Sequence, residues 1–86
     1  MNREELVLKL DALGCRMNDR RLQMLDDLLH IGEITDVEDF WITVRKKLPV
    51  SWATVHNFLN TLCLYGILEK NNNVGRNIRY SFKEAS

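Results

Sequence analysis

Large apolar residues recur every three or four positions through the first half of the chain. Side chains at this spacing share one face of a helix, so the pattern predicts amphipathic helices over roughly 3–13, 19–30 and 36–47. Gly14 follows the first of these segments, and glycine commonly ends a helix. Pro49 cannot continue the third helix and sets the next one at an angle.

Polar residues with capping side chains stand at the expected helix starts. Asn18 precedes the second helix and Ser51 precedes a fourth, and both residue types accept hydrogen bonds from free backbone N–H groups. Thr35 is followed three residues later by Glu38, which is the spacing of a capping box at the third helix. These signals place three helix starts independently of the apolar pattern.

The fourth helix, over roughly 52–65, has one apolar stripe and one polar face. The stripe at helical spacing is made by Val55, Phe58, Leu59 and Leu62. The opposite face consists of Ala53, Asn57, Asn60, Thr61 and Leu64, flanked by Thr54 and His56. A merely solvated helix usually carries Lys and Glu, so this polar composition indicates a binding face.

The segment after Gly66 changes from helical to strand-like periodicity. Residues 67–70 and 78–82 read as strands, and the stretch 71–77 between them is rich in Asn and Gly, which favour turns. The second strand alternates, which predicts inward Ile78, Tyr80 and Phe82. Four helices followed by a two-stranded β-hairpin give an α+β class, mostly α, typical of a winged helix-turn-helix.

Charge is divided along the chain although the formal net charge is zero. Residues 1–40 contain 5 basic and 10 acidic side chains, whereas residues 41–86 contain 7 basic and 2 acidic ones. Only the second half is therefore expected to attract phosphate. The length of 86 residues and a hydrophobic content of 45% fit one folded domain over 1–86.

Candidate catalytic chemistry is missing from the sequence. Cys15 and Cys63 are isolated, so neither a zinc site nor a redox motif is indicated, and together with the lack of a signal peptide they suggest a reducing, cytoplasmic setting. No apolar run approaches the roughly 20 residues that span a bilayer. We expect no enzyme, no catalytic residue, no cofactor, no metal site, no membrane association and no small-molecule substrate.

Several segments, in order, resemble the ferric uptake regulator (Fur) family of repressors. Residues 51–59, S-W-A-T-V-H-N-F-L, are similar to the family stretch S-x-A-T-V-Y-R-x-L. Residues 13–21, L-G-C-R-M-N-D-R-R, resemble the segment L-G-x-[KR]-x-T-x-x-R. The helix exit at 65–68 and the wing at 75–80 also match, and the resemblance extends over roughly 10–82.

The resemblance implies a DNA-binding domain whose fourth helix faces the major groove through His56 and Asn57. Together with the position of the other polar side chains, it gives as candidate DNA-binding residues Arg16, Arg21, Ser51, Trp52, Thr54, His56, Asn57, Asn60, Arg76 and Arg79. Simpler roles stay open for six of them: a helix cap for Ser51, core packing for Trp52, ordinary solvent exposure for His56 and Asn57, and a solvated hairpin for Arg76 and Arg79.

The chain departs from the family pattern in two ways. His56 and Asn57 stand where family members usually have Tyr and Arg, and Arg reads guanine whereas Asn prefers adenine. Family members also continue into a dimerisation domain with His-, Glu- and Cys-rich metal ligands, whereas this chain ends at Ser86. We therefore expect a DNA-binding domain without the dimerisation and metal-sensing half.

The expected function is sequence-specific transcriptional regulation, as a Fur-like repressor that occupies an operator. Its expected partners are double-stranded DNA and a second copy of the chain, because repressors commonly dimerise on palindromic sites. The alternative is a winged-helix protein–protein interaction module that has lost DNA readout, which the zero net charge and the acidic first half favour. A metal-responsive sensor is a third hypothesis, and the missing ligand half argues against it.

Overall fold

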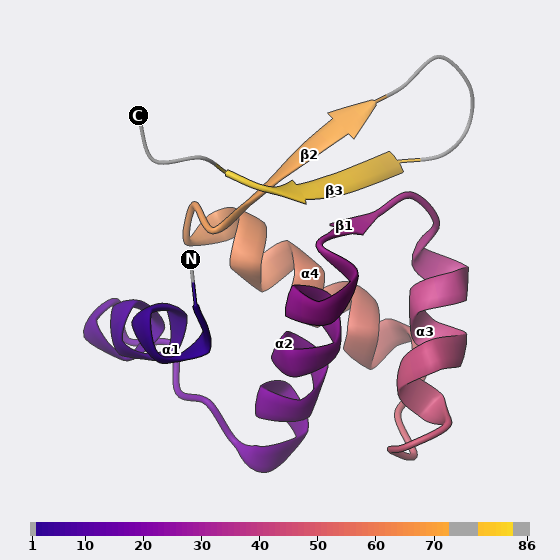
Figure 1. The fold of residues 1–86 in the computed structure, drawn as a ribbon, viewed down its shortest axis with the longest axis horizontal. Coiled ribbons are helices and arrows are strands. Elements are labelled where there is room, and N and C mark those ends of the chain that lie inside the picture. Colours follow the sequence, from indigo (N-terminus) through magenta and orange to yellow (C-terminus); the bar gives the residue numbers. More distant parts are fainter. Residues whose placement is uncertain (1, 73–77, 84–86) are drawn as a thin grey trace.

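Helices make up most of the chain, and a small antiparallel sheet covers one end of them (Figure 1). The computed structural model describes residues 2–72 and 78–83. Within these residues the elements are, in order, α1 (Arg3–Ala12), α2 (Asp19–Ile31), β1 (Glu33–Ile34), α3 (Val37–Arg45), α4 (Trp52–Leu64), β2 (Leu68–Asn72) and β3 (Ile78–Phe82). The predicted order of four helices and a hairpin is confirmed, with bounds shifted by one or two residues.

Among the described residues the sheet has three strands rather than the two of the predicted hairpin. Its order is β1-β3-β2, with Ile34 opposite Tyr80 on one side of β3 and Leu68 opposite Phe82 on the other. β1 consists of two residues, which is too short to give an alternating pattern. Its pairing places the segment before α3 directly beside the second strand of the hairpin.

The helix caps agree with the sequence at two starts and differ at a third. Asn18 and Ser51 cap α2 and α4 as predicted. The capping box of Thr35 and Glu38 is wrong by one residue, because α3 is capped by Asp36, whose Oδ1 accepts the backbone N–H of Glu38 at 2.9 Å. Asp36 has the extended backbone that a capping residue needs, and its short side chain reaches an N–H two residues ahead.

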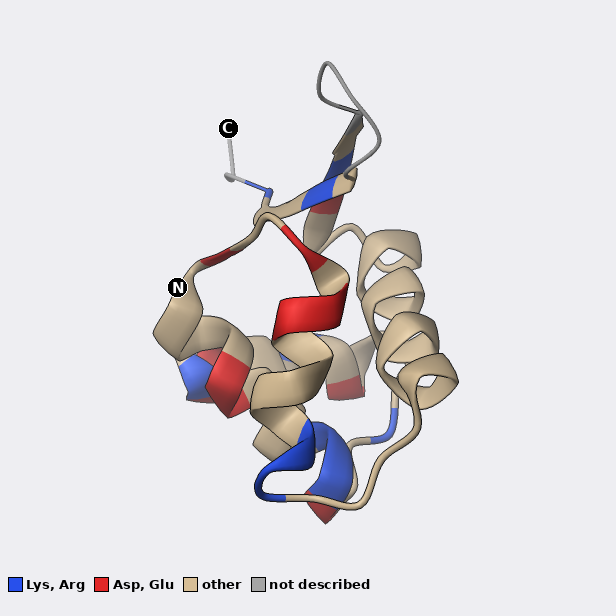
Figure 2. Ribbon diagram, turned by 90° about the vertical axis from the view of Figure 1, so that its right-hand side faces the viewer, with Lys and Arg blue, Asp and Glu red and all other residues tan. Residues whose placement is uncertain are grey.

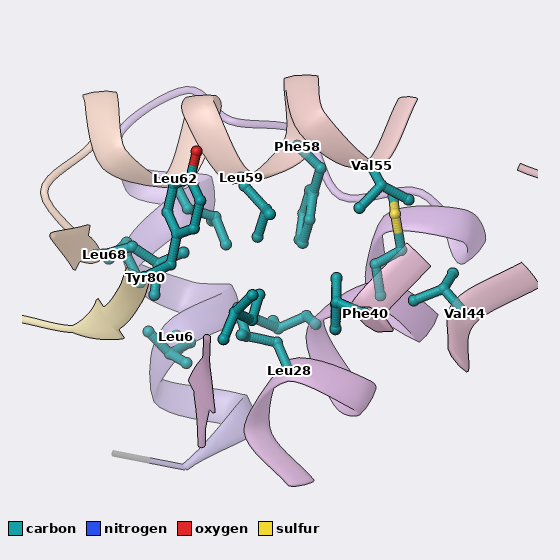
Figure 3. Close-up of a cluster of buried hydrophobic side chains, with 14 of the residues drawn as sticks. Leu6, Leu28, Phe40, Val44, Val55, Phe58, Leu59, Leu62, Leu68 and Tyr80 are labelled. Atoms are coloured by element: carbon teal, nitrogen blue, oxygen red, sulfur yellow. The ribbon is translucent and has the colours of Figure 1, made fainter. Parts of the chain in front are cut away.

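The core gathers one buried face from every helix and the middle of β3 (Figure 3). The predicted stripe of α4 is buried, and Leu6, Phe40 and Tyr80 meet it from α1, α3 and β3. Burying each such side chain contributes about 1.5–3 kcal/mol. On β3, Tyr80 is fully buried, while Ile78 and Phe82 pack partly buried against the same cluster, which confirms the predicted inward face.

A tight glycine turn directs the chain from α4 into the sheet. Gly66 has a φ of 76°, a left-handed conformation that residues with a Cβ adopt at a cost. Beyond it, the N–H of Ile67 donates to the carbonyl of Leu62 at 2.9 Å, which closes the end of the helix. This turn fixes the angle between α4 and β2, and so the position of the hairpin relative to the helix.

Candidate nucleic-acid interface

The outward face of α4 is an uncharged ridge. Its exposed members are Ala53, Asn57, Asn60 and Leu64, which we call the α4 ridge. Figure 2 shows α4 free of Lys, Arg, Asp and Glu along its whole length. Leu64 is 83% exposed, which is unusual for a leucine on a helix. A polyanion approaching this ridge would meet amide groups and methyl groups, so any attraction for phosphate has to come from neighbouring elements.

The start of α4 is held by a two-hydroxyl cap. Ser51 Oγ accepts the backbone N–H of Thr54 at 3.1 Å and lies 2.9 Å from Thr54 Oγ1. The hydroxyls of two candidate DNA-binding residues therefore meet at one point, at the positive end of the helix dipole. Helix N-termini of this kind are favourable positions for a phosphate.

Arginines from the start of α2 lie beside this end of α4. An open hollow of about 260 Å³, which we call the α2-side hollow, is lined by Asn18, Arg20, Arg21, Met24, Thr54, Asn57 and Phe58. It brings Arg20 and Arg21 next to Thr54 and Asn57, although more than 30 residues separate them in sequence. Arg20 is exposed and was missed as a candidate, although it adjoins Arg21 in the family-like segment.

Arg21 has a structural contact that the sequence did not reveal. One of its guanidinium nitrogens, Nη1, donates to the carbonyl of Arg16 at 2.9 Å and lies 3.9 Å from the buried Cys15 Sγ. Arg21 thus ties the loop between α1 and α2 to the start of α2. Arg16 itself has an exposed side chain beside this tie.

The opposite flank of α4 carries Trp52 and His56. Their ring centroids are 4.7 Å apart, and Trp52 is 46% exposed rather than packed in the core. His56 is half-buried, and its Nδ1 lies 3.1 Å from Nδ2 of Asn60. A second open hollow of about 260 Å³, which we call the α3-side hollow, separates Trp52 and His56 from the acidic start of α3, Asp36 and Glu38.

Of the two candidate arginines of the wing, Arg79 lies within the described residues and Arg76 lies outside them. Arg79 on β3 places its Nε 2.8 Å from Oε1 of Glu33 on β1, and both side chains are nearly half exposed. This ion pair joins the two strands. The positive charge of Arg79, which was expected to contact DNA, is therefore partly balanced by Glu33 within the sheet.

The basic end of α3 lies near the beginning of α4 (Figure 2). Arg45 stacks over Trp41, with 4.7 Å from its guanidinium carbon to the ring centroid. Lys47 Nζ lies 2.9 Å from Oδ1 of Asp27, a buried carboxylate on α2. Lys46, between them, is also exposed.

Other chemistry among the described residues is limited. Burial raises the pKa of the Cys63 thiol, and the nearby charge of Lys70 partly offsets the rise. Over 2–72 and 78–83, no group of three His, Cys, Asp or Glu side chains is arranged to hold a metal ion. No helix in this part of the chain has the length and apolar character needed to cross a bilayer.

The class of protein follows from the order of these elements. Two successive helices, α3 and α4, are followed by the β2–β3 hairpin, and β1 completes the sheet, which defines a winged helix-turn-helix. The ferric uptake regulator Fur of Helicobacter pylori, whose structure reveals three functional metal binding sites, shares this fold. It aligns with a TM-score of 0.73 at 21% sequence identity, over 95% of this chain and 57% of that chain.

A second structural neighbour is the peroxide stress regulator of Campylobacter jejuni. It aligns with a TM-score of 0.64 at 24% identity, over 100% of this chain and 62% of that chain. No protein-family model and no curated protein matches the sequence. The resemblance to Fur-family regulators is thus confirmed in the fold, and this chain spans less than two thirds of either regulator.

Proposed function

We propose that this winged helix binds double-stranded DNA as part of a Fur-like transcriptional regulator, and that it represses by occupying its operator. The observation that carries the proposal is the arrangement around the start of α4. A neutral hydrogen-bonding ridge is bordered there by the α2-side hollow, with Arg20 and Arg21, and by the basic end of α3 (Figure 2). Neutral amides suit base edges, and guanidinium groups at the border suit phosphates.

In the proposed complex, α4 enters the major groove with the α4 ridge toward the bases. Arg20 and Arg16 contact the phosphates of one DNA strand, and a phosphate binds at the N-terminus of α4 beside the cap of Ser51 and Thr54. The β2–β3 wing lies along the flanking backbone, which Arg76, from the stretch 73–77 between its strands, is also proposed to contact. A second copy of the chain on the other half-site, and action in the cytoplasm, belong to the same proposal.

The proposal is tested by polarisation binding to a mixed-sequence DNA duplex at about 50 and 200 mM salt, because the slope of log affinity against log salt reports the number of phosphate contacts. Replacing Arg20 with alanine should weaken binding to all sequences and reduce the salt slope by about one unit. Arg20 is the sharper choice, because Arg21 also supports the α1–α2 loop.

Lys83→Ala provides the matched control, since it removes one positive charge from an exposed residue past the end of β3, at the far end of the sheet from the start of α4 (Figure 1). It should leave affinity and slope nearly unchanged. Equal slopes for Arg20→Ala and Lys83→Ala, or no duplex binding at the lower salt, would contradict the proposal.

The second candidate function is a protein-interaction module. The specific observation for it is the α3-side hollow, where Asp36 and Glu38 face the exposed Trp52. Carboxylates beside an aromatic ring suit a basic peptide. This candidate gains if duplex binding fails while a lysine-rich peptide binds the purified domain and Glu38→Gln weakens that binding.

A further inference from the structure

We propose that Asn57 and Asn60 read adenine in the major groove and that His56 is the residue that positions Asn60. This inference rests on the proposed function and specifies the sequence that the domain selects. Its basis is the chemistry of the α4 ridge together with one contact on its flank, between His56 Nδ1 and Asn60 Nδ2.

The part of the α4 ridge that would face the bases has the length of about three base pairs. Ala53, Asn57 and Asn60 are exposed on one face, and a rise of 1.5 Å per residue places Asn60 about 10 Å beyond Ala53. Base pairs follow one another at about 3.4 Å, so these three side chains span about three base pairs. Each can therefore address its own base pair.

α4 lacks the residue types that usually recognise guanine. Guanine presents two acceptors in the major groove and is read by Arg or Lys, and α4 contains neither. Arg21, which lines the α2-side hollow beside Asn57, already donates to the carbonyl of Arg16. A carboxamide instead offers one acceptor and one donor, the pattern that adenine N6 and N7 complement. The methyl group of Ala53 suits a thymine methyl.

Asn60 differs from Asn57 in having a partner within the protein. His56 Nδ1 lies 3.1 Å from Asn60 Nδ2, and in the tautomer with the ring proton on Nε2 it accepts one hydrogen of the Asn60 amide. That leaves the amide oxygen and the second N–H of Asn60 for a base. His56 is itself held by the ring of Trp52 and faces Asp36 and Glu38 across the α3-side hollow. The histidine is thus a positioning residue for the amide beside it.

The experiment is selection from a randomised duplex pool, followed by binding of single-base variants of the selected site. The wild-type domain should select A·T pairs at the positions beneath Asn57 and Asn60. Asn57→Ala should lose discrimination at one of these pairs by about 5- to 140-fold, the range of a good bidentate contact. The base preferences at the other positions of the site should stay the same.

His56→Phe keeps an aromatic ring against Trp52 and removes the acceptor. It should reduce discrimination only at the pair beneath Asn60, while the preference given by Asn57 stays. His56→Gln, which restores an acceptor, should recover part of the loss. Thermal unfolding of each variant reports whether the fold is kept, and a change confined to one base pair is not expected from general destabilisation.

The outcomes separate this inference from the function on which it rests. Absence of duplex binding by the wild-type domain at low salt overturns both. Duplex binding with guanine selected beneath α4, or an Asn57→Ala variant that weakens every sequence equally, overturns only the adenine readout. An unchanged preference in His56→Phe at every position overturns the positioning role of His56.

Discussion

Replacing Lys47 with methionine would leave the carboxylate of Asp27 without its counter-charge. The side chain of Asp27 is 7% exposed, and its Oδ1 accepts from Lys47 Nζ at 2.9 Å and more weakly from Gln23 Nε2 at 3.4 Å. Its second oxygen, Oδ2, is buried and has no hydrogen-bond partner among the described residues. Lys47 therefore supplies most of the compensation for a negative charge between α2 and the end of α3.

The size of the effect follows from the burial of the two partners. Breaking a fully buried ion pair costs about 3–5 kcal/mol, because one charge remains desolvated. The side chain of Lys47 is 57% exposed, so water can partly replace the ammonium group. We expect Lys47→Met to lower the free energy of unfolding by about 2 kcal/mol. At about 4–8 °C per kcal/mol for a domain of this size, Tm should fall by roughly 10 °C.

The assay is urea unfolding followed by circular dichroism, with Lys46→Met as the matched control. Lys46 is the exposed neighbour in sequence, and its replacement removes the same charge. The control should change stability by less than about 0.5 kcal/mol. Adding Asp27→Asn to Lys47→Met should restore part of the loss, because the buried charge is then gone. Equal stability of the two lysine variants would refute the role given to the ion pair.

Three further predictions concern single groups. Ser51→Ala should lower the free energy of unfolding by about 1 kcal/mol, because it removes the cap of α4; a loss below about 0.3 kcal/mol in urea unfolding would contradict this. Tyr80→Phe should be neutral or stabilising by up to about 1 kcal/mol. The buried hydroxyl of Tyr80 points toward α4 (Figure 3) and has no hydrogen-bond partner among the described residues. A clear loss of stability in this variant would reveal a partner. Because burial raises the pKa of Cys63, its thiolate fraction at a given pH is smaller than in the unfolded chain, and alkylation should be slower than in urea. Lys70→Ala should raise that pKa further, so an unchanged pH profile of alkylation would argue against the charge effect.

The parts of the fold that the sequence predicted are those set by local chemistry. The stripe of α4 and the caps Asn18 and Ser51 depend on residues within a few positions of each other, and the structure has them as predicted. β1 depends on pairing with a distant strand, so two residues gave no periodic signal. At α3, both Thr35 and Asp36 can cap, and only the backbone conformation decides between them.

The candidate site was predictable to a similar extent. The composition of the α4 ridge follows directly from helical spacing, and the pair of His56 and Asn60 has the spacing of helix neighbours. The contact of Arg21 with the Arg16 carbonyl depends on the path of a loop. The pairing of Arg79 with Glu33 depends on the strand that was missed. Side-chain contacts across elements thus changed the expected roles of two arginines.

The pairing of β1 with β3 also bears on how the chain folds and fails to fold. Ile34 and Tyr80 are separated by more than half of the sequence, so their contact requires closure of a long loop, whereas β2 and β3 are neighbours along the chain. β1 is therefore expected to dock after the hairpin has formed. Until then β3 has an unpaired edge, and an open strand edge can pair with another chain. In partly folded molecules this edge is the expected starting point for aggregation.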